Sequence, residues 1–214
     1  DGPEPGKYNF SSVRLLGSVG ESINPQAWKW LRKHVGGGTA SFIDTWWQSE
    51  TGSTICSPRP HDPAFAPEGT FPEGTPHCTP LPGCATREVP GVSVRVVDEH
   101  GDFVEPGKQG FIVVDKIGPS MARTVWGDPQ RYLNSYWKHY GTRGWFLAGD
   151  GAKVDDEGNV YILGRIDDVI NISGHRLSTI EIESALVTHP AVVEAGVCPV
   201  EDELTGHQAV AYVT

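Results

Sequence analysis

The sequence predicts an α/β protein in which a parallel sheet is followed by a small barrel-like β region and then by the beginning of a small α+β region. Three observations lead to this fold class. A strand over 13–19, a helix after Asn24 and a strand over 41–43 follow one another in the βαβ order of parallel sheets. Short alternating apolar runs separated by turns fill 92–163, as in antiparallel strands. Beyond Gly164 the pattern is again strand, helix, strand.

The first strand–helix–strand unit carries clear boundary signals. Asn24 is a favoured N-cap residue, and Pro25 suits the first position of a helix. The three glycines at 36–38 end that helix. Because the carboxyl ends of parallel strands meet at one sheet edge, we expect the loops at 20–22 and 44–50 to lie together there, where open α/β sheets bind ligands.

The middle of the chain begins with a proline-rich segment and continues with strands. Residues 57–91 hold nine of the 17 prolines and predict a loop. Strands are predicted at 92–97 and 110–114, and the turn at 155–158 leads into another strand at 160–163. Between these strands, Asp128 precedes a proline and predicts the start of a short helix.

The last part of the chain has a candidate capping box. Ser178 and Glu181 have the spacing in which each side chain bonds the other residue's backbone N–H, and we expect them to open a helix over 181–188.

Composition places the chain among soluble globular proteins. It has 214 residues, of which 38% are hydrophobic, enough for one large domain or parts of two. No apolar run approaches the ~18 residues of a membrane span, and the polar start has no signal-peptide pattern, so a cytoplasmic or organelle-matrix location is expected. The formal net charge of -10 argues against nucleic acid and anionic membranes as partners.

The four cysteines form no recognisable framework. Cys56, Cys78, Cys84 and Cys198 contain no C-x-x-C pair, and free thiols are expected. Two histidines, at 61 and 77, lie near Cys78 and Cys84, but their spacing fits no tetrahedral zinc template. A metal-binding interaction domain built on this segment is nevertheless kept as an alternative hypothesis.

Residues 44–52, DTWWQSETG, are the strongest candidate site, because two adjacent tryptophans lie among polar groups at the end of an apolar strand. Large rings there can wall a small apolar pocket, while the polar side chains can bond a polar ligand or a hydrated cation. The alternative is a core tryptophan pair followed by a solvated turn.

Four motifs resemble those of the AMP-forming acetyl-CoA synthetases, within the acyl-adenylate-forming enzymes. Besides DTWWQSETG they are LGSVGESINP at 16–25, WFLAGDG at 145–151 and GRIDDVINISGHR at 164–176, in the family's order. The resemblance implies that 1–164 is the C-terminal portion of the large adenylating domain, with most of 57–91 an insertion. It implies that 165–214 begins the mobile C-terminal domain, with Asp167 at the hinge.

The resemblance also implies site residues. Ser22 stands where the family usually has proline, and Ser49 replaces threonine but keeps the hydroxyl. The nucleotide-binding residues implied are Gly20, Glu21, Ser22, Asp44, Thr45, Trp46, Trp47, Gln48, Ser49, Asp150, Arg165 and Arg176. Trp47 would also close the acyl pocket, Ser173 and Gly174 would meet coenzyme A, Glu50 would approach magnesium, and Val187, His189 and Val192 would bind a structural cation.

Without the resemblance, several of these residues also suit structural roles. Gly20 and Asp150 could belong to ordinary turns, the two arginines could form surface ion pairs, and His189 could be a helix cap or a surface residue.

The expected activity is acetate–CoA ligation, in which acetate, ATP and coenzyme A give acetyl-CoA, AMP and pyrophosphate through an acetyl-adenylate. The family's phosphate loop is expected upstream of Asp1 and its catalytic lysine beyond Thr214, so no catalytic residue is expected within the chain and the isolated chain should be inactive. A propionate-preferring ligase and a non-catalytic nucleotide-binding module are alternatives. ATP, Mg2+ and coenzyme A are the cofactors implied, with small molecules as partners.

Overall fold

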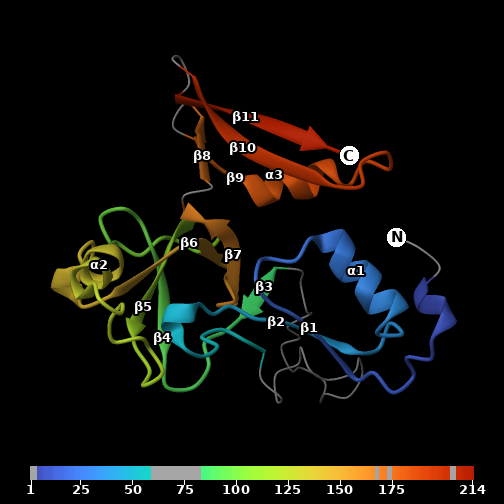
Figure 1. The fold of residues 1–214 in the computed structure, drawn as a ribbon, viewed down its shortest axis with the longest axis horizontal. Helices are drawn as coiled ribbons and strands as arrows, with labels where there is room; N and C mark the ends of the chain where they lie inside the picture. Colours follow the sequence, from blue (N-terminus) through green and yellow to red (C-terminus); the bar gives the residue numbers. More distant parts are fainter. Residues whose placement is uncertain (1–3, 59–82, 167–168, 173–174, 203–205) are drawn as a thin grey trace.

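The computed structural model describes residues 4–58, 83–166, 169–172, 175–202 and 206–214. These residues form three sheets (Figure 1). A two-stranded parallel sheet and a five-stranded antiparallel sheet make up the body, and a four-stranded sheet lies above them in a lobe of its own. Most of the proline-rich segment, 59–82, lies outside the described residues.

The first sheet confirms the predicted βαβ unit. After the 3-10 turn η1 (Glu4–Lys7), strand β1 (Leu15–Ser18) runs parallel to β2 (Ser41–Asp44), and helix α1 (Pro25–His34) connects them. The Asn24 side chain accepts a bond from the Gln26 backbone N–H at 2.8 Å, as an N-cap does. Trp28 of α1 packs on Phe42 of β2 with ring centroids 5.3 Å apart, and both side chains are buried. This contact fixes the helix on the sheet.

The five-stranded sheet confirms the predicted β region but also includes residues 84–86, which lie in the segment 57–91 that was predicted to be a loop. Its strands are β3 (Cys84–Thr86), β4 (Ser93–Val97), β5 (Gln109–Lys116), β6 (Phe146–Val154) and β7 (Val160–Arg165), in the order β3-β7-β6-β5-β4. Alternate residues of β5 and β6 enter the main core, where Ile112, Val114 and Phe146 are fully buried. Trp46 belongs to the same core, so the loop after β2 is anchored to this sheet.

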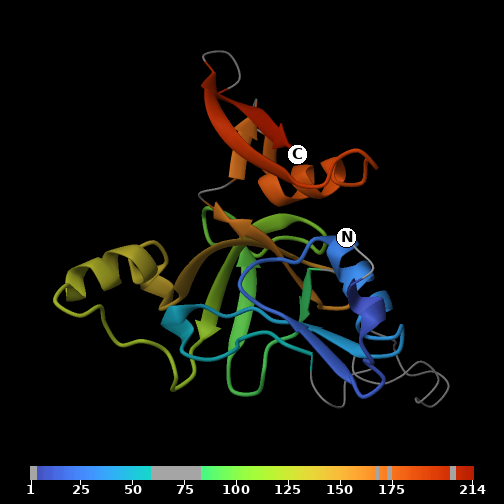
Figure 2. The same cartoon turned by 45° about the vertical axis from the view of Figure 1, so that its right-hand side comes forward.

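A helical segment packs against one end of β6, as Figure 2 shows from a second angle. It contains helix α2 (Pro129–Tyr132), the π-helical turn η4 (Leu133–Trp137) and the 3-10 turn η5 (Gly141–Arg143). The short helix is confirmed with its N-cap, because the Asp128 carboxylate accepts the Arg131 backbone N–H at 2.9 Å. The π turn has no signal in the sequence.

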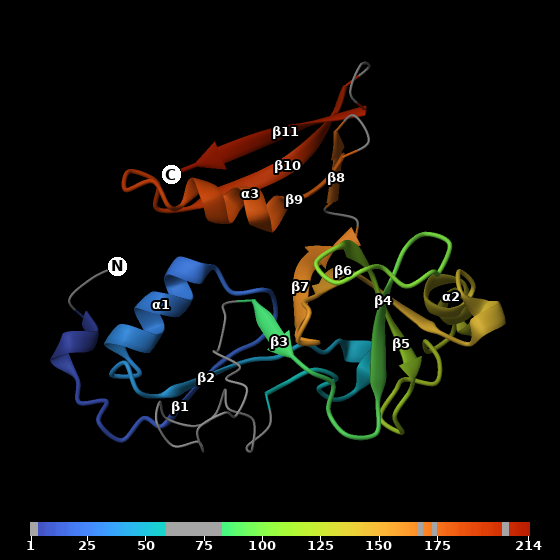
Figure 3. The ribbon, with the colours of Figure 1, turned by 180° about the vertical axis from the view of Figure 1, so that it is seen from behind.

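The upper lobe contains β8 (Val169–Ile172), β9 (His175–Ser178), helix α3 (Thr179–Leu186), β10 (Ala195–Asp202) and β11 (Gly206–Val213), with strand order β10-β11-β8-β9. Figure 3 shows the lobe from behind, with α3 on the side that faces the body. Within the described parts of the chain, no helix combines the length and the apolar character that crossing a membrane requires.

The predicted capping box at the start of α3 is wrong. Ser178 is the N-cap, but its hydroxyl makes no cap bond and instead donates to the Leu163 carbonyl at 2.6 Å. Glu181 lies 3.8 Å from Lys153 Nζ and accepts from Gln109 at 3.4 Å. Both side chains therefore bond groups of the five-stranded sheet, and these tertiary partners replace the local pairing.

One glycine of the 44–52 motif permits a contact that no other residue allows. Gly52 has φ 65°, and a Cβ there would lie 2.2 Å from the Ser120 carbonyl oxygen. We expect Gly52→Ala to lower the free energy of unfolding by about 3 kcal/mol, because backbone strain and a clash add together. Gly37→Ala is the matched control, since Gly37 has φ 60° with nothing within 4 Å, and it should cost about 1 kcal/mol. Equal losses in urea unfolding would refute the contact.

Candidate functional site

A cleft opens where the loops after β1 and β2 meet β3, β6, β7 and α3. The sequence prediction that the two loops converge is confirmed, since both line this cleft. The predicted nucleotide residues that line it are Gly20, Glu21, Ser22, Asp44, Thr45, Trp46, Trp47, Gln48, Asp150 and Arg165. Ser49 is not among the lining residues, and the side chain of Arg176 lies outside the described part of the structure.

Two polar contacts set the positions of the loops. The Thr45 backbone N–H and hydroxyl both approach the Ser18 carbonyl at 3.3 Å, which joins the two strand ends. The Ser22 hydroxyl donates to the Ile162 carbonyl of β7 at 2.9 Å. The loops after β1 and β2 and residues of the five-stranded sheet therefore line one cleft together.

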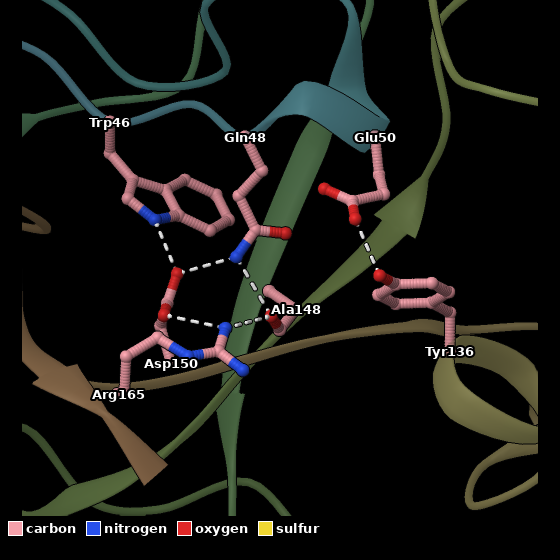
Figure 4. A network of polar contacts seen from close by, with 7 residues as sticks. All are labelled: Trp46, Gln48, Glu50, Tyr136, Ala148, Asp150 and Arg165. Carbon is pink, nitrogen blue, oxygen red and sulfur yellow. Dashed lines mark hydrogen bonds and ion pairs between the residues drawn. The ribbon is translucent and has the colours of Figure 1, made fainter. Parts of the chain in front are cut away.

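The centre of the site is a network around Asp150, shown in Figure 4. Its Oδ2 accepts bonds from Trp46 Nε1 at 2.9 Å and Gln48 Nε2 at 2.7 Å. Its Oδ1 accepts from Arg165 Nη1 at 3.2 Å. The Ala148 carbonyl accepts further bonds from Gln48 and Arg165, so five residues from three segments hold one another. Burial raises the pKa of the Asp150 carboxyl, and the bonds from Trp46 and Gln48 and the charge of Arg165 oppose that rise.

Asp150 lies inside strand β6 and not in an ordinary turn, which was the structural alternative to a site role. Strand β6 continues past it to Val154, because β5 and β7 pair with the strand on both sides. Gly149 has φ 76°, and a Cβ there would lie 2.9 Å from Arg165 Nη2. The glycine therefore leaves room for the guanidinium beside the carboxylate without ending the strand.

The two adjacent tryptophans have different environments. Trp46 is only 5% exposed and packs in the main core, whereas Trp47 is 46% exposed although both line the cleft. The hypothesis of a core tryptophan therefore describes Trp46, and the hypothesis of a site tryptophan describes Trp47. An exposed indole at the cleft is free to contact a ligand.

Asp44 is buried at the cleft with part of its bonding capacity unused. It is 6% exposed, and within the described residues its Oδ2 has no hydrogen-bond partner. Burial raises the pKa of Asp44 to about 6, although backbone N–H groups of Gly83 and Thr45 lower it. A buried acceptor without a donor suits a ligand N–H or O–H group.

We expect this carboxyl to make stability depend on pH. The folded protein retains the Asp44 proton to about pH 6, while the unfolded chain releases it near pH 4, so the stability contribution falls as pH rises through that window. Asp44→Asn removes the titration. The difference in unfolding free energy between the two proteins should change by about 2–3 kcal/mol between pH 4 and pH 7, in favour of the variant at the higher pH. Urea unfolding at several pH values measures this difference, and a difference that stays constant between pH 4 and pH 7 would contradict the burial argument.

Several lining residues were missed by sequence reasoning. Ile162 and Ile180 carry no local signal, because an apolar residue in a strand or helix predicts only burial. Tyr136 is the more important omission. Its hydroxyl donates to Glu50 Oε1 at 2.5 Å, and this hydrogen bond together with burial raises the pKa of Tyr136 to about 12, although the charge of Arg165 lowers it. It comes from the π turn, and 86 residues separate it from Glu50.

The predicted metal residues occupy two places. Glu50 is not among the residues that line the cleft, but it lies near Gln48, which does (Figure 4). No group of three or more His, Cys, Asp or Glu side chains that could hold a metal ion occurs in the part of the chain that the structure describes. Val187, His189 and Val192 form the turn after α3, where the Val192 N–H donates to the His189 carbonyl at 3.0 Å. The predicted cation site in this turn stays a prediction.

The remaining predicted residues lie outside the described structure. These are Asp167, Ser173 and Gly174, together with His61, His77 and Cys78 of the proline-rich segment. The described cysteines, Cys56, Cys84 and Cys198, form no disulfide bond with one another.

The fold and the cleft define an α/β protein with a polar cleft at the carboxyl edge of a parallel strand pair. Comparison with known proteins is more specific. The AMP-binding enzyme family matches residues 2–126, and the AMP-binding enzyme C-terminal domain matches residues 181–214. The chain belongs to the family of AMP-binding enzymes.

The curated relatives are longer than this chain. It is 48% identical to an acetyl-coenzyme A synthetase of Streptomyces avermitilis over 98% of the chain and 29% of that protein. It is 46% identical to one of Mycolicibacterium smegmatis over 98% of the chain and 21% of that protein. Among solved structures, the anthranilate CoA ligase AuaEII in complex with anthranoyl-AMP matches 97% of this chain and 34% of its own, with a TM-score of 0.75 and 25% identity. The chain therefore spans only about a fifth to a third of its relatives.

Proposed function

We propose that this chain is the central and C-terminal part of an AMP-forming acetate–CoA ligase. The observation that carries the proposal is the 46–48% identity to acetyl-coenzyme A synthetases, which extends over 98% of the chain and so includes every element of the cleft. The substrates would be acetate, ATP and coenzyme A, and an acetyl-adenylate would be the intermediate.

The Asp150 network supports a nucleotide as the ligand. A carboxylate offers about four lone-pair sites, and Trp46, Gln48 and Arg165 use three of them. Oδ1 has one donor and can accept a second, such as a ribose hydroxyl. Asp44 would accept a hydrogen bond from an amino group of the base, because its buried Oδ2 requires a hydrogen-bond donor. The Arg165 guanidinium would offer charge-assisted bonds to ribose or phosphate oxygens.

Magnesium fits the proposed site through Glu50. Mg2+ is commonly held by one or two carboxylates together with substrate phosphates rather than by a cage of protein ligands. One carboxylate beside the cleft meets this requirement, and the ion would neutralise phosphate charge during adenylation. The protein's own part is to hold acetate and the α-phosphate in reacting geometry and to exclude water.

We also propose the domain division that the sequence suggested, 1–164 and 165–214. The body and upper lobe of the structure agree with a boundary near the end of β7. Asp167 would be the hinge, Ser173 and Gly174 would meet coenzyme A, and His189 with its two valines would hold a cation.

The test is a pair of half-reaction assays on the full-length protein that carries this chain. Acetate-dependent exchange of pyrophosphate into ATP reports adenylation, and formation of acetyl-CoA reports the thioester step. Both should occur, with acetate preferred to propionate. A higher kcat/KM for propionate would reassign the substrate, and nucleotide binding without exchange would overturn the ligase.

A further inference from the structure

The contact between Glu50 and Tyr136 joins the cleft to the helical segment beside β6. The Tyr136 hydroxyl donates a hydrogen bond to Oε1 of the Glu50 carboxyl group. Such a bond holds one carboxylate oxygen in a defined position. Figure 4 shows the second oxygen pointing away from Tyr136, on the side of Gln48, where the polar network begins.

Packing fixes the position of the Tyr136 hydroxyl. The ring lies parallel to that of Phe146, with centroids 5.1 Å apart and planes inclined by 8°. Phe146 is fully buried. Tyr132 also contacts the Tyr136 ring, with ring centroids 5.6 Å apart. Tyr136 lies in the π turn η4, whose extra residue changes the direction of the following side chains, and such turns often occur at functional sites.

The backbone of Glu50 is held from the other side. Its carbonyl accepts the Ala122 N–H at 2.7 Å, next to the Gly52 contact with Ser120. The remaining freedom of Glu50 is rotation of its side chain, which the Tyr136 bond removes. Ordering a flexible side chain before a ligand arrives lowers the cost of binding.

We propose that Tyr136 is a positioning residue that holds Glu50 with one carboxylate oxygen directed to a divalent cation bound with the nucleotide. The inference rests on the proposed function, because it takes the cation–nucleotide complex as the ligand of Glu50. Tyr136 itself would not touch the substrate. Its effect would be on cation affinity rather than on the affinity of the cleft for nucleotide alone.

The decisive variant is Tyr136→Phe, which keeps the stacked ring and removes only the hydroxyl. Mn2+ binding is followed by electron paramagnetic resonance in the full-length protein with a non-hydrolysable ATP analogue. We expect the Kd for Mn2+ to rise about 3- to 10-fold, as for one side chain that must be ordered on binding. The Kd of the analogue without metal should change less than twofold, and the variant should unfold at the same urea concentration.

Tyr132→Phe is the matched control. It removes a hydroxyl from the adjacent ring, where the group donates to the Ala122 carbonyl instead of to Glu50. It should leave Mn2+ affinity unchanged. Equal weakening by the two tyrosine variants would overturn the inference, because the effect would then be structural.

A double-mutant cycle completes the test. Glu50→Gln should weaken Mn2+ binding, and adding Tyr136→Phe should cause no further loss. Unchanged Mn2+ affinity in Glu50→Gln, or additive losses, would reject the positioning role. The activity assays distinguish a failure of the proposed function: altered Mn2+ affinity in a protein that does not adenylate acetate would support the Tyr136 role and reject the ligase.

Discussion

Asp150→Ala should cause the largest loss of both stability and nucleotide binding. The carboxylate is 7% exposed and accepts bonds from Trp46, Gln48 and Arg165, so its removal leaves buried donors without acceptors. We expect the free energy of unfolding to fall by about 2–4 kcal/mol, mainly from the indole and amide donors, because the Arg165 side chain is half exposed and can reach water. Urea unfolding measures this loss, and calorimetry of ATP binding should show at least a ~100-fold weakening, the scale on which an unpaired buried polar group acts.

Asp115→Ala is the control for this prediction. Asp115 lies on β5 and pairs with Arg95 at 3.1 Å, but it does not line the cleft. This variant should lose some stability and keep its affinity for nucleotide. If Asp150→Ala binds ATP as the parent does, the network is structural and the cleft is not the nucleotide site.

Trp47→Gly should reverse the substrate preference of the full-length enzyme. The exposed indole lies at the cleft, where it would fill the space that a longer alkyl chain needs. Removing it should lower kcat/KM for acetate and raise it for longer acids, since each methylene in an apolar pocket is worth about 1–3 kcal/mol. The measurement is kcat/KM for unbranched acids of increasing chain length.

Trp46→Phe is the control that distinguishes the role of Trp46 from that of Trp47. It removes the indole N–H that bonds Asp150 and keeps a large apolar ring in the core. It should weaken nucleotide binding without changing the order of acid preference. An unchanged order in Trp47→Gly, with the protein folded, would remove Trp47 from the acyl pocket.

Local signals predicted most of the framework. The helix after Asn24, the parallel strands and the convergence of their loops followed from capping chemistry and from the geometry of βαβ units. The resemblance to the acetyl-CoA synthetases then predicted twelve nucleotide-binding residues, and ten of them line the cleft. The fold class and the family are confirmed, while the residue roles and the domain boundary stay predictions.

Local signals failed where two side chains had several suitable partners. The spacing of Ser178 and Glu181 fits a capping box, yet the Leu163 carbonyl and the Lys153 side chain bond them instead. A local hydrogen bond competes with distant partners for the same atoms, and the sequence does not show the distant partners.

The sequence by itself determined most of the strands and helices, because hydrophobic period, capping and glycine placement act over a few neighbouring residues. The π turn η4 and strand β3 had no such local signal. Only the tertiary structure decided the environment of each side chain. Trp46 and Trp47 are adjacent in sequence, but only the first is buried in the main core, where it donates a hydrogen bond to Asp150, 104 residues further along the chain. Tyr136 meets Glu50 across 86 residues for the same reason. Such contacts are set by how the sheets pack on one another, which no local pattern encodes.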